Sequence, residues 1–433
     1  MTAAIGVDGV ARILAHRAEV DEHVAVLRTE QITTVGAGIE RTVHERALHV
    51  TVMCDRRGGR GQATFTLTGP ITADAVSALV TEAIAAAQLG LGPPWRMPPA
   101  SAPARVDVAD PALSDTATAA AEIAAAIAPG RAEILASRVK VTHRTTAIIT
   151  STGLFAAFPD DLCTVENAHL VRRVRRRRDL DLDAFKATAA RRAREPAPAP
   201  LPAGHYDVVL TLDALTAAAA PCPGSGESAA YARYGVFATI AAHADAGLAR
   251  RGITRLGRGH SVYGEHRLSG DPLTIDSDGT LHHAPLSAPL GPLGEPTRRF
   301  SICRAGKMND LGLDLREAAL RKAAPNGNVR NLVVAAGTLP EAEILAPGER
   351  PLVVVRAPSS FEINPRTGAA SLTLGIAHLY RPGSSDPAPV RAGTWSGDIL
   401  ALLAGAHLAT ATRRRGWYRG PMAIRIPGLA ISG

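Results

Sequence analysis

The residues of this chain whose types and spacing suggest chemistry are histidines. The segment HERALH begins at His44 and ends at His49, and Glu45 follows the first histidine. On a helix, this pattern could place two imidazoles on one zinc ion, with the glutamate beside them as a general base. The segment lies between β-branched runs and predicts a strand, on which residues an odd number apart face opposite sides of the sheet. We therefore expect His44 and His49 to share no metal.

His243 is the next candidate, within a helix predicted at 229–247. The helix contains no glutamate, and the acid nearest to His243 is Asp245. A lone histidine on a helix is more often a surface or core residue than a ligand. The adjacent pair at 282–283 lies in a predicted loop, where neighbouring side chains rarely converge on one ion. The sequence therefore indicates neither a metal site nor a catalytic residue in this chain.

Serine and cysteine patterns give no stronger signal. Neither Ser225 nor Ser261 lies in a G-x-S-x-G elbow, and no base or orienting carboxylate can be assigned to either. The cysteines lie far apart without CxxC spacing, which argues against a disulfide framework and a structural zinc site. They are Cys54, Cys163, Cys222 and Cys303. We expect four unpaired thiols.

The positive charge of the chain, +8, comes almost wholly from arginine, since lysine occurs only at positions 140, 186, 307 and 322. The arginine-rich run at 172–178 could contact phosphates. However, aspartates follow it at once and no aromatic residue is interleaved. We interpret the run as a solvated strand edge or a subunit contact, and we do not expect nucleic-acid binding.

Nothing in the sequence suggests a membrane protein. The leucine-rich stretch at 399–411 is too short to span a bilayer. The first ten residues lack the charged and apolar regions of a signal peptide. We expect a soluble cytoplasmic protein.

The elements predicted for residues 1–195 form an α/β sandwich, a sheet with two helices over it. After a first helix at 7–17, alternating or β-branched segments predict about five strands, at 22–33, 39–43, 48–54, 62–68 and 139–150. Thr72 is the expected N-cap of one covering helix, and the other is expected at 114–128. A stretch rich in Pro and Ala at 91–111 is a predicted connector.

A second domain follows the Pro-rich stretch EPAPAPLPA, which begins at residue 195 and predicts a linker at 196–204. The remaining residues, 205–433, are expected to be β-rich. Strands are predicted at 206–212, 352–355 and 371–380, and helices at 213–220 and 229–247.

Short motifs follow one another through this second half. They are GRGHSVYGE at 257–265, LTID at 273–276, GEPTRR at 294–299, NGNVRNL at 326–332, N-x-x-T-G-x-x-S at 364–371 and the tail at 421–433. In this order they resemble the C-terminal domain of the TldD/PmbA (TldE) family of two-subunit bacterial peptidases. With the predicted elements, they indicate an α+β fold, in which the N-terminal α/β sandwich precedes a larger β-rich domain of the TldD/PmbA type.

The resemblance implies a particular subunit type. The metal-binding half of the family carries a helical HExxxH and a late cysteine in this domain. The corresponding stretches here, 231–247 and 413–418, hold one histidine and no thiol. The chain is therefore expected to be the metal-free, TldE/PmbA-type subunit of a heteromeric metallopeptidase, with no cofactor of its own. Zinc would lie in a TldD-like partner, in a heterodimer or a larger assembly.

The resemblance also implies a substrate class and a set of chamber residues. Substrates would be unstructured peptides or peptide-like molecules, and amide or other C–N bond hydrolysis in natural-product biosynthesis is one setting. The residues expected to line the chamber are His243, Arg330, Asn331, Asn364 and Thr367. An alternative is that Asn364, Thr367 and Gly368 only shape a hairpin, because Asn and Gly tolerate positive φ and Thr can cap a turn.

Three other functions remain open from the sequence. A free-standing binding or scaffold protein would ignore a TldD-like partner. A DNA- or gyrase-associated modulator would show binding that collapses with salt. A homomeric metalloenzyme using His44 and His49 would contain stoichiometric zinc.

Overall fold

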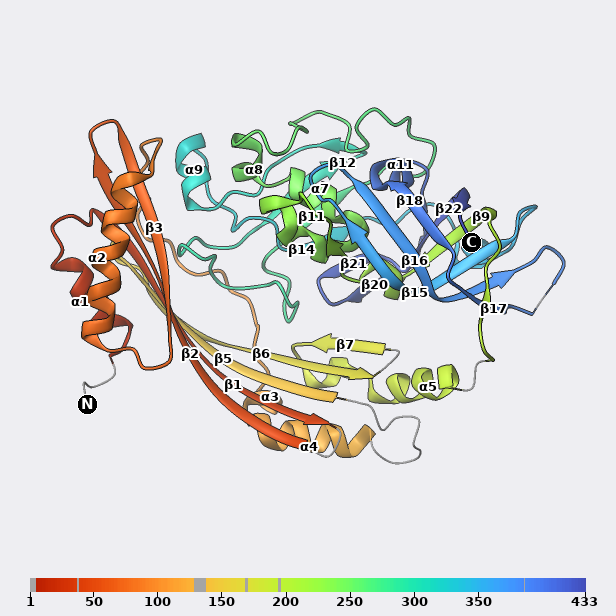
Figure 1. Ribbon diagram of the computed structural model, residues 1–433, viewed down its shortest axis with the longest axis horizontal. Coiled ribbons are helices and arrows are strands. Elements are labelled where there is room, and N and C mark those ends of the chain that lie inside the picture. Colours follow the sequence, from red (N-terminus) through yellow and green to blue (C-terminus); the bar gives the residue numbers. More distant parts are fainter. Residues whose placement is uncertain (1–4, 37–38, 128–137, 168–169, 194–195, 385) are drawn as a thin grey trace. The chain divides into compact units, whose positions relative to one another are not determined.

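The computed structural model describes residues 5–36, 39–127, 138–167, 170–193, 196–384 and 386–433. Helices and strands are mixed and strands dominate, so the predicted α+β fold class is confirmed (Figure 1). The chain divides into two compact units. Unit 1 comprises Met1–Ala193, Gly279–Arg298 and Leu313–Asn328, and unit 2 comprises Arg194–Asp278, Arg299–Gly312 and Val329–Gly433. The predicted linker lies next to the first division, whereas the two later segments of unit 1 were not predicted.

A seven-stranded antiparallel sheet forms the centre of unit 1, in the order β4-β3-β2-β1-β5-β6-β7 (Figure 1). Its strands are β1 Glu22–Gly36, β2 Ile39–Arg56, β3 Gly59–Thr68, β4 Leu91–Gly92, β5 Arg138–Thr150, β6 Phe155–Asn167 and β7 Leu170–Val174. The segments 39–43 and 48–54 were predicted as separate strands. They form one strand instead, because β2 pairs with β1 without a break from Ile39 to Met53.

Helices cover both ends of one face of this sheet. Leu27 of β1 packs with α1 (Val7–Ala15) and α2 (Ala73–Leu89), and Val35 packs at the other end with α4 (Thr116–Ile127) and its neighbours. Those neighbours are α3 Pro111–Ser114, η2 Arg177–Leu180 and α5 Leu182–Ala193. Leu27 and Val35 are eight residues apart, so both groups of helices lie on the same face. The hydroxyl of Thr72 accepts from Ala75 N at 3.3 Å, which confirms the predicted N-cap of α2.

The opposite face of the sheet is covered by chain from two other regions. Val26 of β1 packs against Trp95 of the connector and against Leu290 and Leu315 of the two later segments. Leu315 begins helix α9 (Leu315–Arg321). These segments therefore complete the core of unit 1.

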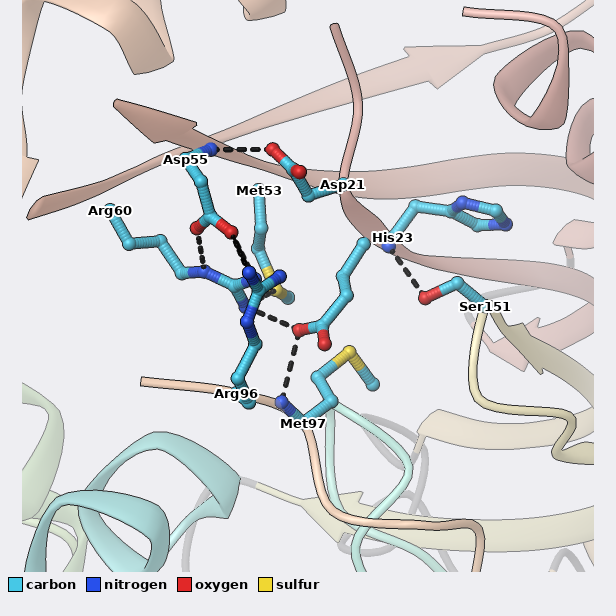
Figure 2. Close-up of polar contacts among 9 residues, drawn as sticks. Asp21, His23, Met53, Asp55, Arg60, Arg96, Met97 and Ser151 are labelled. Carbon is cyan, nitrogen blue, oxygen red and sulfur yellow. Dashed lines mark hydrogen bonds and ion pairs between the residues drawn. The ribbon is translucent and has the colours of Figure 1, made fainter. Parts of the chain in front are cut away.

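A buried ion-pair network fastens the connector to the sheet (Figure 2). Arg60 of β3 is 2% exposed and pairs with the carboxylates of Glu22 and Asp55. Oε2 of Glu22 also accepts from the backbone N of Met97 at 2.9 Å. The guanidinium of Arg60 lies 5.3 Å from the ring centre of Trp95. One cation thus joins β1, β2 and the connector.

Unit 2 contains two sheets. The larger follows the order β19-β22-β9-β15-β16-β17-β8, with β10 beside β15 and β18 beside β16. Its strands are β8 Ala199–Pro200, β9 Gly204–Thr211, β10 Ala220–Pro221, β15 Leu352–Ile363, β16 Ala369–Tyr380, β17 Ala388–Arg391, β18 Thr394–Asp398, β19 His407–Leu408 and β22 Ala423–Ile431. The smaller follows the order β13-β12-β11-β14-β21-β20. Its strands are β11 Ile275–Asp278, β12 Arg299–Arg304, β13 Lys307–Met308, β14 Asn331–Val334, β20 Thr412–Arg415 and β21 Tyr418–Pro421.

The helices of unit 2 are shorter than the sequence predicted. They are α6 Leu212–Leu215, η3 Gly226–Phe237, α7 Ala238–His243, α8 Ala246–Arg250, α10 Glu341–Ile344 and α11 Ile399–Ala404. The predicted helix at 213–220 is the single turn α6. The predicted helix at 229–247 is broken at Gly235, and again at Asp245, whose side chain caps α8 by accepting from Leu248 N at 2.9 Å.

The four cysteines are unpaired, as predicted, and only Cys222 is partly exposed. Within the described ranges, no helix combines the length and the apolar character needed to cross a membrane.

Candidate functional site

The HERALH segment is part of strand β2, as predicted. His44 pairs with Gln31 and His49 pairs with Val26 of β1. Because the two histidines are five positions apart on one strand, an odd number, their side chains lie on opposite faces of the sheet. The Nδ1 atom of His49 lies 2.8 Å from the hydroxyl of Thr66 on β3. The two imidazoles therefore cannot share an ion.

His243 ends helix α7 and is buried. Its Nε2 donates to the backbone oxygen of Arg366 at 3.1 Å, which assigns the proton of the neutral ring to Nε2. Its Nδ1 is buried without a hydrogen-bond partner among the described residues. Arg366 belongs to the turn between β15 and β16, which also contains Asn364 and Thr367. Three of the five predicted residues are thus brought to one place.

That turn is held by its own polar groups. The backbone oxygen of Asn364 accepts from Gly368 N at 2.9 Å, and its Oδ1 accepts from Arg366 N at 3.1 Å. The hydroxyl of Thr367 accepts from Ala369 N at 3.3 Å. Gly368 has φ 86°, and a Cβ there would lie 2.6 Å from Asp398 Oδ1. A positive φ was considered for both Asn364 and Gly368. Only Gly368 has one, whereas Asn364 stabilises the turn through its side chain.

Arg330 and Asn331 lie at the start of β14. The hydroxyl of Tyr234 donates to the backbone oxygen of Arg330 at 2.8 Å, and Arg330 N donates to the hydroxyl of Ser277 at 2.8 Å. Asn331 is fully buried, and its Nδ2 donates to the backbone oxygen of Asp278 at 2.7 Å. The Asn331 side chain therefore fixes β14 to β11.

An aromatic cluster connects helix α7, which ends at His243, with the start of β14. This cluster was not predicted from the sequence. Tyr234 contacts Trp417 edge-on at a centroid distance of 5.1 Å, and Phe237 stacks on Tyr418 at 5.7 Å. Both Tyr234 and Phe237 belong to η3, which leads directly into α7. Between them Gly235 has φ 51°, and a Cβ there would lie 2.6 Å from the backbone oxygen of Ala217. The spacing of these aromatic residues gave no periodic signal, because a 3-10 helix and a kink carry them.

Burial controls the ionisation of this cluster. Burial raises the pKa of Tyr234 to about 12. Burial, followed by the negative charge of Asp245, raises the pKa of Tyr231 as well. Both phenols are therefore neutral hydrogen-bond donors near neutral pH, and Tyr231 donates to Asp245. Burial lowers the pKa of His243, and its contact with Arg366 offsets only part of that effect.

The lowered pKa of His243 predicts a loss of stability in acid. The unfolded chain takes up a proton near pH 6.5, the ordinary value, while the folded chain does so only at lower pH. Stability from the neutral ring is thus present above pH 6.5, and it is lost progressively as the pH falls from 6.5 to the lower pKa of the folded chain. We expect His243→Gln, which retains a donor for Arg366, to show a smaller drop in urea midpoint between about pH 7.5 and about pH 5. His44→Gln, on an exposed residue, is the control, and equal drops in His243→Gln and the parent would contradict the assignment.

The segment 234–433, which contains all five predicted residues, matches the model of a protein family described as the PmbA/TldA metallopeptidase C-terminal domain. Residues 234–433 therefore form a C-terminal domain of the TldD/PmbA family. No curated protein matches it.

Solved structures with the same fold cover nearly the whole of this chain. TldE from Thermococcus kodakarensis is 14% identical and covers 99% of both chains, with a TM-score of 0.70. Two proteins described as candidate modulators of DNA gyrase are also similar. The one from Thermotoga maritima is 16% identical over 98% of this chain and 99% of its own, with a TM-score of 0.73. The one from Bacteroides thetaiotaomicron is 14% identical over 99% and 97%, with a TM-score of 0.71.

A metallopeptidase domain implies a metal, but the residues around His243 do not fit one. Helix α7 reads ATIAAH, so Thr239 is the polar residue one turn before His243. The Nε2 atom of His243 is engaged by a backbone carbonyl, and the stretch 413–418 contains no cysteine that could supply a thiolate. Across the described part of the chain, no three His, Cys, Asp or Glu side chains gather so that they could hold a metal ion.

Proposed function

We propose that this chain is the metal-free, TldE-type subunit of a heteromeric metallopeptidase, and that a TldD-like partner holds the zinc. The observation that carries the proposal is that helix α7 lacks the residues of a metal site. Its histidine, His243, is buried against the Arg366 carbonyl, and a threonine lies one turn before it. This arrangement supports a helix that has a structural role here. The fold shared with TldE of Thermococcus kodakarensis over 99% of both chains adds support.

In this proposal the subunit shapes a chamber in which unstructured peptides or peptide-like molecules are cleaved. The turn at Asn364–Gly368 and the start of β14 are its contribution to the wall, because both are rigid. The turn is closed by five hydrogen bonds among residues 364–369, and β14 is fixed by Tyr234 and Asn331. Rigid elements position substrate contacts better than mobile loops do. A cytoplasmic location and a role in natural-product biosynthesis belong to the same proposal.

Coexpression with a TldD-like protein tests this function. We expect the two chains to coelute on size exclusion, and we expect cleavage of an unstructured peptide only by the complex. Activity should disappear when the glutamate of the partner's HExxxH is replaced by glutamine, because that residue is the general base in such sites. Peptide cleavage by the isolated chain that stops on addition of a chelator would contradict the proposal. So would failure of the two chains to associate.

The arginine run does not favour the gyrase-associated alternative. Arg176 pairs with Asp179 at 2.8 Å, and Arg177 pairs with Glu122. Arg175 is buried and donates to the backbone oxygen of Pro285 at 2.8 Å. These three guanidinium groups bind other groups of unit 1. They therefore stabilise this unit and are not arranged as a phosphate-binding surface.

A further inference from the structure

A hollow lined by charged and apolar residues lies in unit 2, and His243 is not part of its lining. It has a volume of about 740 Å³, including its open mouth, and lies where β15, β16 and β22 of the large sheet meet β20 of the small one. One part of its lining is apolar and comprises Leu212, Ile344, Leu345, Val354, Met422 and Ala423. The charged part consists of Arg356, Arg413, Arg415 and Asp213, and Tyr380 and Thr211 complete the wall.

The charges in this lining do not balance. Three arginines face one carboxylate, so the wall has an excess of two positive charges. Asp213 pairs with Arg415. Arg413 makes no ion pair within the described residues, and its Nη1 contacts only the backbone oxygen of the adjacent Thr412, at 3.1 Å. Arg356 makes no ion pair in that part of the chain either, and its Nε is buried without a hydrogen-bond partner.

Strand geometry brings the arginines together. Arg413 and Arg415 are two residues apart on β20, so they project from the same face, and both line the hollow. Arg356 reaches it from β15. A buried guanidinium nitrogen without a partner is costly unless an acceptor meets it. The wall is therefore complementary to an anion whose oxygens can take charged hydrogen bonds from two sides.

We propose that this hollow binds the C-terminal carboxylate of an extended peptide whose last residue is apolar. Arg356 and Arg413 would bind the carboxylate, and the wall formed by Ile344, Val354 and Met422 would take the side chain. An α-carboxylate adjoins the side chain of its own residue, so both parts of the lining are satisfied by one residue. An Asp or Glu side chain or free phosphate would leave the apolar wall unused. The choice of a peptide as the ligand rests on the proposed function, whereas the anion-binding character of the hollow does not.

Isothermal titration of the isolated full-length chain tests the site. The probe is an N-acetylated tetrapeptide that ends in leucine with a free carboxylate, compared with the same peptide amidated at its C-terminus. We expect the amide to bind roughly 10- to 100-fold more weakly, the loss typical for a hydrogen bond to a charged group. Arg413→Ala should weaken binding of the free acid by a similar factor. Arg356→Met, which keeps most of the apolar stem, should do the same.

Arg414→Ala is the matched control, because it removes the same charge from the same strand at a residue outside the lining. It should leave the affinity within about twofold of the parent. The site as proposed is overturned if the amide binds as well as the acid, if an amidated peptide with an internal glutamate binds equally, or if inorganic phosphate competes more strongly than the peptide. Thermal melts show whether each variant folds, and the exposed Arg413 gives a test that does not depend on Arg356. A negative binding result would not affect the expected association with a TldD-like partner. The two proposals can therefore be rejected independently.

Discussion

Replacing Arg60 with methionine should lower the free energy of unfolding by about 3–5 kcal/mol, the cost typical for removing one partner of a buried ion pair. Arg60 is 2% exposed, and its loss leaves the carboxylates of Glu22 and Asp55 without their shared cation. Trp95 also loses the guanidinium at 5.3 Å from its ring centre. Urea denaturation followed by circular dichroism measures the change.

Arg96 provides the matched control in the same network. Its guanidinium lies 2.5 Å from Asp55 Oδ2, but its side chain is 66% exposed. Water screens an exposed pair, so Arg96→Ala should cost only about 0–1 kcal/mol. If Arg60→Met costs no more than Arg96→Ala, the network does not hold the connector. A Glu22→Gln change in the Arg60→Met background should recover part of the loss, because it removes one of the two carboxylates left unpaired.

Local signals sufficed to predict most of the early elements of unit 1. The cap at Thr72, the helix that starts at Val7 and the strand nature of HERALH depend on short-range periodicity and capping, and the structure confirms them. Strand β6 was missed because its sequence contains Pro159, Asp160 and Asp161, residues typical of loops. Both aspartates are buried, and tertiary contacts make this possible. Asp161 Oδ1 lies 2.6 Å from Nδ1 of His143, a residue on the neighbouring strand.

Long-range assembly could not be read from patterns. The segment Gly279–Arg298 joins unit 1 although it follows Arg194–Asp278 of unit 2, and it carries most of the GEPTRR motif. Its Leu290 is 4% exposed in the core beside Val24 and Ile148 of the sheet. One leucine in a loop rich in glycine and proline has no periodicity that would assign it to a distant core. Motif order therefore indicated the family, and contacts alone showed which unit each motif belongs to.

The candidate site shows the same division. His243 and the turn containing Asn364 were selected independently, and one hydrogen bond to Arg366 joins them. Asn331 was selected as a chamber residue, but its amide fixes two strands together. Tyr234 was not selected at all, because its role depends on an acceptor 96 residues away. Residue type can indicate a candidate polar residue. Whether that residue binds a ligand or stabilises the fold depends on the groups that the fold places beside it.

Tyr234 is where the next large effect on stability is expected. Tyr234→Ala should lower the free energy of unfolding by about 3–5 kcal/mol, the cost typical for removing a large buried aromatic ring. Tyr234→Phe keeps the ring and its contact with Trp417 and removes only the hydroxyl. It should cost about 1–3 kcal/mol, because the carbonyl of Arg330 loses its buried donor. Urea titration of both variants separates the two contributions. Equal losses would mean that the hydroxyl, through its bonds to Val329 and Arg330, accounts for the whole effect of Tyr234. An unchanged Phe variant would mean that packing of the ring alone holds the start of β14, and that Arg330 is positioned without help from η3.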